Sequence, residues 1–88
     1  MPQPHRRAIT NETRHPYIVE LAVVGDRLDL QLSRQIMQFH QSRRIEPRFG
    51  RRTAASRKLN YFRWCFPDLL IALAFIEQFG GELYKYGI

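Results

Sequence analysis

The positive charge of this chain is concentrated in one segment, residues 43–58, which offers the clearest chemistry in the sequence. The segment holds seven Lys or Arg residues and one acid, a formal net charge of +6, whereas the rest of the chain carries seven of each sign. Arginine binds phosphate through paired hydrogen bonds, and a group of basic side chains displaces counterions from a nucleic acid. The segment therefore predicts a surface for an anionic partner.

Nucleic acid is the first class of partner that this segment indicates. It leads into an aromatic stretch where Tyr61 and Arg63 share one face of a predicted strand and present flat groups that can stack on bases. We expect RNA or single-stranded DNA to bind the basic side chains together with these two strand positions: Arg43, Arg44, Arg48, Arg51, Arg52, Arg57, Lys58, Tyr61 and Arg63. Phe49 either adds another stacking surface or lies in the core.

Other interpretations of the same charge are open. A basic loop also suits a solvated surface or an acidic protein partner. Arg outnumbers Lys twelve to two, and the coding bias of a GC-rich genome produces that preference without a functional cause. The charge therefore indicates a binding module without identifying its ligand.

The elements that position this segment are clearest near the C-terminal end of the chain. Residues 61–66 predict a strand, because aromatic residues suit a pleated surface and side chains alternate between its faces. Its core face carries three aromatic residues: Phe62, Trp64 and Phe66. Asp68 is a suitable N-cap for a helix over 69–79, which ends at the glycine pair 80–81. A last strand is expected over 82–86.

The helix predicted over 69–79 is apolar on two sides. One stripe at helical spacing suits the sheet: Leu69, Ala72, Leu73, Ile76 and Phe79. Leu70, Ile71 and Phe75 lie off that stripe and predict an interface, since a helix that is apolar on two sides is buried on both or contacts another chain. The alternative function is therefore a protein-interaction or assembly module, such as a homodimer with two-fold symmetry.

The first half of the chain has the same plan. Residues 17–24 form a β-branched run that predicts a strand. A helix capped by Asp26 should follow and end near Arg43, and His40 within it is expected to be structural. Residues 45–52 predict either a turn or a short edge strand, while the proline-rich residues 1–16 predict a flexible basic arm before a single domain over 17–88.

These elements predict an α+β fold. Strand, helix, short strand, strand, helix and strand in this order make the β-α-β-β-α-β pattern of the ferredoxin-like fold. Its two helices cover one face of an antiparallel sheet, and we expect the other face to stay open for a ligand or a partner. If residues 45–52 form a turn and not a strand, a three-stranded β-α-β-α-β sheet remains.

Part of the second half resembles the RNA-recognition-motif domains. The resemblance lies in the spacing of six residues that match that family's third strand and second helix: Phe66, Asp68, Ala72, Ile76, Phe79 and Gly81. The family's strand signature, K/R-G-F/Y-G/A-F-V-x-F/Y, finds Tyr61 and Phe66 here, and Arg63 stands where its second stacking aromatic belongs. The resemblance implies a ferredoxin-like fold and contacts with RNA.

Several function classes are disfavoured. No glycine-rich phosphate loop is present and the acids are scattered, so we expect no enzyme, cofactor or metal site. The lone Cys65 leaves no partner for an internal disulfide and fits a reducing cytoplasm. The apolar runs are shorter than the ~20 residues of a membrane span, and no signal peptide is recognisable. A cytoplasmic protein without a membrane role is therefore expected.

Overall fold

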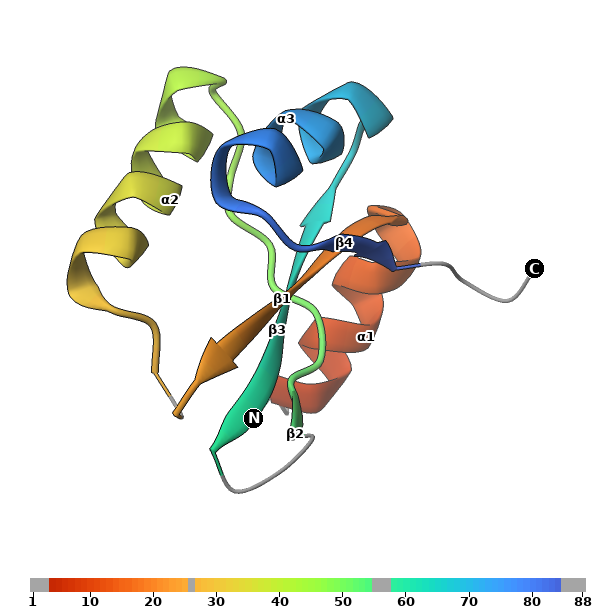
Figure 1. Ribbon diagram of the computed structural model, residues 1–88. Coiled ribbons are helices and arrows are strands. Elements are labelled where there is room, and N and C mark those ends of the chain that lie inside the picture. Colours follow the sequence, from red (N-terminus) through yellow and green to blue (C-terminus); the bar gives the residue numbers. More distant parts are fainter. Residues whose placement is uncertain (1–3, 26, 55–57, 85–88) are drawn as a thin grey trace.

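Three helices and an antiparallel sheet make up the described part of the chain (Figure 1). The structure, a computed structural model, describes residues 4–25, 27–54 and 58–84. The elements follow in this order: α1 (Pro4–Arg14), β1 (Tyr17–Val24), α2 (Leu30–Ser42), β2 (Thr53–Ala54), β3 (Leu59–Phe66), α3 (Leu69–Phe79) and β4 (Glu82–Tyr84). The predicted α+β class is confirmed.

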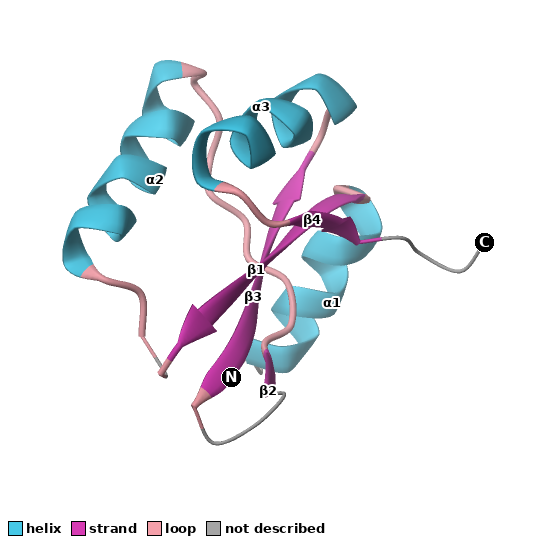
Figure 2. Cartoon of the chain, viewed as in Figure 1, coloured by secondary structure: helices cyan, strands magenta, loops and turns pink. Residues whose placement is uncertain are grey.

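Strand β1 is the centre of the sheet (Figure 2). It pairs along its whole length with β3, from Tyr17 opposite Phe66 to Val24 opposite Leu59. On its other side Ile18–Glu20 pairs with β4, and the two-residue β2 extends the sheet beyond β3. All pairs are antiparallel, and the strand order is β2-β3-β1-β4.

The two helices after β1 begin at aspartate caps. The Asp29 carboxylate accepts hydrogen bonds from the backbone N–H groups of Gln31 and Leu32, at 3.1 and 3.2 Å. The predicted cap, Asp26, is therefore three residues too early, and it lies outside the described residues. Asp68 caps α3 as predicted by accepting from Leu70 N at 2.7 Å, and Gly80, at φ 86°, follows its last turn.

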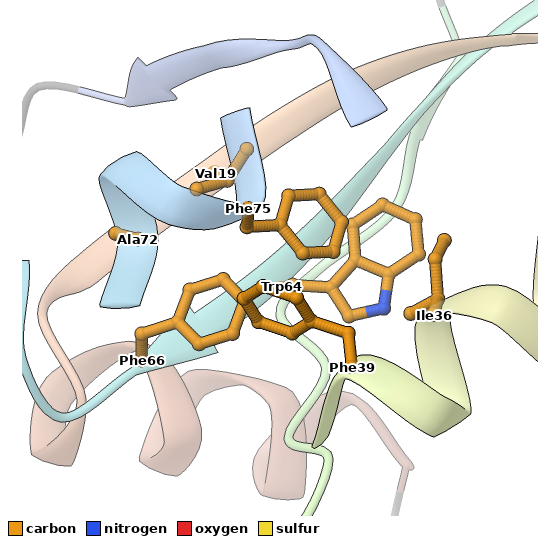
Figure 3. Close-up of a cluster of buried hydrophobic side chains, with 7 residues drawn as sticks. All are labelled: Val19, Ile36, Phe39, Trp64, Phe66, Ala72 and Phe75. Atoms are coloured by element: carbon orange, nitrogen blue, oxygen red, sulfur yellow. The ribbon is translucent and has the colours of Figure 1, made fainter. Parts of the chain in front are cut away.

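The core lies between the sheet and the pair α2 and α3 (Figure 3). Its aromatic rings contact one another, with Phe75 centred 5.2 Å from Trp64 and 5.3 Å from Phe66. The buried cluster is Val19, Ile36, Phe39, Trp64, Phe66, Ala72 and Phe75. The inward face predicted for Trp64 and Phe66 is confirmed, and Phe62 packs partly buried against them.

Two of the three predicted interface residues face this core instead of a partner. Phe75 has no exposed surface, and Ile71 packs partly buried against the cluster. The side of α3 assigned to an interface is therefore largely the side that meets the sheet. The outer side carries Leu69, Leu70 and Leu73, which are exposed. Tyr17, the first residue of β1, is exposed as well.

The second face of the sheet carries a helix that the sequence did not predict. Residues 4–14, expected within a flexible arm, form α1, and Figure 1 shows this helix across the strands from α2. Ile18 and Cys65, whose side chains point away from the main core, are both buried. Among the residues of α1 whose burial is described, Asn11 and Glu12 are the buried ones, so the helix is attached by polar groups and has no apolar stripe that would reveal it.

None of the described helices combines the length and the apolar character needed to cross a membrane.

Candidate nucleic-acid interface

Residues 49–53 of the predicted basic segment form an irregular edge beside β3. Phe49 lies opposite Trp64 in an isolated bridge, and Thr53 lies opposite Tyr61 at the start of β2. Three residues separate Phe49 from Thr53, but only two separate Tyr61 from Trp64, so the edge carries one extra residue. This is the geometry of a β-bulge, which redirects side chains and frees a backbone group from the ladder.

Glu12 of α1 fills this bulge. Its carboxylate has no exposed surface and accepts from the backbone N–H of Arg51 at 2.6 Å. The Arg51 guanidinium adds bonds of 3.1 and 3.2 Å, and Arg63 Nη1 lies 3.3 Å from Oε1. A Cβ at Gly50 would stand 2.8 Å from Oε2, so the approach requires glycine. The buried charge is thus paired on several sides.

Arg63 is the other half of this cluster. Its Nε donates to Glu20 at 3.0 Å, and its guanidinium lies 4.0 Å from the centre of the Tyr84 ring. Burial alone would lower the pKa of Arg63, but the hydrogen bond to Glu20 and the charges of Glu12 and Glu20 outweigh it, so the pKa is raised. Arg63 is only 8% exposed. Its predicted role as a stacking surface for a base is therefore corrected: the Tyr84 ring lies against the guanidinium, and Glu12 and Glu20 bind its nitrogen atoms inside the protein.

The other residues predicted to contact nucleic acid differ in how exposed they are. Arg43, Arg44, Arg52 and Lys58 are exposed, Arg48 and Arg51 are partly buried, and Arg57 lies outside the described residues. The Arg43 guanidinium lies 3.8 Å from the centre of the Phe39 ring, and Arg52 lies 4.3 Å from that of Phe62. Phe62 belongs to the core face of β3. Arg52 therefore lies on the core-facing side of that strand.

Tyr61 is on the opposite face of the same strand. It lines a shallow pocket of about 380 Å³ with Glu20, Leu21, Ala22, Gly81 and Glu82. Two carboxylates beside it make this surface unsuitable for phosphate groups. The structure therefore separates Tyr61 and Arg52, which the sequence places together in one binding surface.

A basic groove that the sequence did not predict lies between α1 and residues 46–49. It has a volume of about 670 Å³, and its lining is Arg6, Arg7, Thr10, Asn11, Glu46, Pro47, Arg48 and Phe49. The groove is held in shape by Asn11, whose Nδ2 donates to the Phe49 carbonyl at 2.9 Å. The sequence does hold one signal for the attachment of α1, because Glu12 is the single acid among the first sixteen residues, beside several arginines.

Two residues with potential catalytic chemistry, Cys65 and His40, are buried and do not line this groove. Burial raises the pKa of the Cys65 thiol to about 12, with Glu12 adding to the shift and Arg63 opposing it. Burial lowers the pKa of His40, whose Nδ1 lies 2.8 Å from the Ile36 carbonyl oxygen. Within residues 4–25, 27–54 and 58–84, no group of three or more His, Cys, Asp or Glu side chains is arranged to hold a metal ion.

Comparison with known proteins identifies no relative from which a function could be inferred. The chain matches no protein-family model, and neither a curated protein nor a solved structure shows significant similarity to it.

Proposed function

We propose that this chain is a small basic cytoplasmic module that binds RNA or single-stranded DNA. The observation that carries the proposal is the division of the arginines into two groups. Arg51 and Arg63 are bound to the buried carboxylate of Glu12, whereas Arg43, Arg44 and Arg48 follow one another along the exposed connection after α2. Charge that is not matched by buried acids is available to phosphates.

The side chains of this second group make only weak internal contacts. Arg48 lies 3.4 Å from Glu46, but the two side chains are 41% and 76% exposed. Such a surface pair contributes little to stability and can exchange for a phosphate. The backbone N–H of Arg44 donates to the Gln41 carbonyl at 3.1 Å, but its exposed side chain has no hydrogen bond or ion pair within the described part of the chain. These side chains therefore support a phosphate-binding role.

The fold supports the same class of function. We propose that the architecture is ferredoxin-like with an added N-terminal helix. The strand order β2-β3-β1-β4, with α2 and α3 on one face, supports this assignment and is compatible with the resemblance to RNA-recognition-motif domains. The ligand surface of this chain would differ from theirs, because α1 covers Arg63 on the other face.

The test is a titration of fluorescently labelled single strands of RNA and DNA at several salt concentrations. We expect binding at low salt that weakens linearly on a logarithmic scale. The triple variant Arg43→Ala/Arg44→Ala/Arg48→Ala should bind at least ten-fold more weakly, with a slope reduced by about 2 for three lost phosphate contacts. Absence of binding to every single strand at low salt would refute the proposal.

A second function is favoured by the outer side of α3. Leu69, Leu70 and Leu73 are 41%, 75% and 46% exposed and lie within one turn of the helix. An apolar cluster of this kind marks a protein contact. In this alternative the chain forms a homodimer or binds another protein, and light scattering would give twice the 10.5 kDa mass of the chain. Leu70→Lys should return a dimer to the monomer mass.

A further inference from the structure

We propose that the groove between α1 and residues 46–49 holds one segment of a single strand, with phosphates on the arginines and an unpaired base on Phe49. This inference rests on the proposed nucleic-acid function and assigns its binding site. The site differs from the surface predicted from the sequence, because it uses α1 and the edge beside β3 in place of the sheet face that carries Tyr61.

The groove carries a net positive charge. Arg6, Arg7 and Arg48 line it, and Glu46 is the one acid among its lining residues. Arg6 and Arg7 are exposed on the first turns of α1, and neither has an anionic partner among the described residues. A phosphate is the group that satisfies guanidinium donors most completely, through paired hydrogen bonds.

Phe49 presents an aromatic ring to the groove. This side chain is 49% exposed, although its backbone is fixed. Its carbonyl accepts from Asn11, it is bridged to Trp64, and its ring centre lies 6.3 Å from that of Trp64. One side of the ring is thus supported by the core while the other borders the groove. A rigid, half-exposed aromatic ring beside cations is the arrangement on which single-stranded bases stack.

The chemistry defines the ligand class. Stacking on a protein ring requires a base whose face is uncovered, which excludes bases inside a duplex. Phosphate contacts and stacking are common to RNA and DNA, so the groove should bind both. RNA and DNA probes of the same sequence show whether the groove prefers one of these ligands, since a contact with the 2′-hydroxyl would raise the affinity for RNA alone.

The test compares two charge-matched double variants. Arg6→Ala/Arg7→Ala removes two cations from the groove, while Arg27→Ala/Arg34→Ala removes two exposed cations that do not line it. We expect the first variant to lose about ten-fold in affinity and to reduce the salt slope by about 1.4, with a much smaller effect in the second. Both retain α1, because alanine is the strongest helix former.

Stacking is tested separately at Phe49. Phe49→Leu keeps an apolar side chain but removes the ring, and should weaken single-strand binding by about ten-fold. Phe49→Trp should bind normally and show fluorescence quenching when a single strand is added but not a duplex. Circular dichroism melting of each variant verifies folding.

Three results would overturn the inference in whole or in part. If wild type binds single strands and the groove variants bind as tightly as the Arg27 and Arg34 control, the groove is not the site although the proposed function stands. If Phe49→Leu alone is neutral, stacking is refuted. If wild type binds nothing, both proposals fail together.

Discussion

Arg63 Nη1 lies 3.3 Å from the Oε1 atom of Glu12, although the two residues are 51 positions apart in the chain. This contact joins the first helix to the central part of β3 and crosses the face of the sheet that the sequence predicts to be open. Both side chains are buried, so the pair replaces hydration by mutual hydrogen bonds. It decides which arginines remain available to a ligand.

Removal of the Glu12 carboxylate should be strongly destabilising. Glu12→Ala leaves Arg63 and part of Arg51 as buried charges without this partner, which costs about 3–5 kcal/mol in comparable buried pairs. Urea unfolding gives the free energy directly. The matched control is Glu46→Ala, which breaks the exposed pair with Arg48 and should cost less than about 1 kcal/mol. Equal effects at the two positions would contradict the assigned role of Glu12.

The β-bulge leaves no room for a side chain at Gly50. An alanine Cβ there would lie 2.8 Å from the Glu12 carboxylate and 3.0 Å from the Cβ of Arg63. We expect Gly50→Ala to lower the free energy of unfolding by about 1–3 kcal/mol through overpacking. In the Glu12→Ala background the same change should cost less, because the crowding carboxylate is gone. Additive effects of the two substitutions would argue against their contact.

The stability of the fold should depend on pH through His40. Because burial lowers the pKa of His40 in the folded state, the unfolded chain takes up the proton first as the pH falls below the ordinary value of 6.5. Stability is therefore complete above that pH and declines below it, by at most about 1.4 kcal/mol per pH unit for one proton. Urea midpoints between neutral and mildly acidic pH should decline less steeply in His40→Leu than in wild type. An unchanged slope in the variant would show that His40 is not responsible.

The thiol of Cys65 should be unreactive in the folded protein. Its pKa is raised to about 12, chiefly by burial, so little thiolate forms at neutral pH. We expect labelling by a disulfide reagent to be slow in native buffer and complete within the mixing time in denaturant. Because Cys65 lies on the face that α1 covers, Glu12→Ala should accelerate native labelling more than Glu46→Ala does. Rapid labelling of the wild-type chain would contradict the burial.

The elements with local signals were predictable from the sequence. The strand, cap, helix and glycine stop of β3 and α3 lie next to one another, and each is specified by neighbouring residues such as Asp68 and Gly80. Helix α1 was missed for the opposite reason. It is held by Asn11 and Glu12 through contacts 38 to 51 residues away, and no apolar periodicity records such contacts.

The candidate site was predictable only in its composition. The sequence located the excess charge, but it could not show that Arg63 is neutralised by Glu12 and Glu20 or that Arg6 and Arg7 stand beside Arg48. Phe75 was misplaced because a helix that is apolar on two sides does not indicate which side meets the sheet. Which arginines remain available and which side of α3 meets the sheet both depend on contacts between residues far apart in the sequence. Those contacts are set by the tertiary fold.

The irregular edge beside β3 has a consequence for how copies of this molecule can meet. A continuous edge strand offers a template onto which another chain can add, and proteins prevent this with bulges or very short strands. Here one border of the sheet has the bulge and the two-residue β2, and the other has the three residues of β4. Within the described residues neither border offers a long regular edge for strand addition, so contacts between helices are the more favourable route for the association of copies.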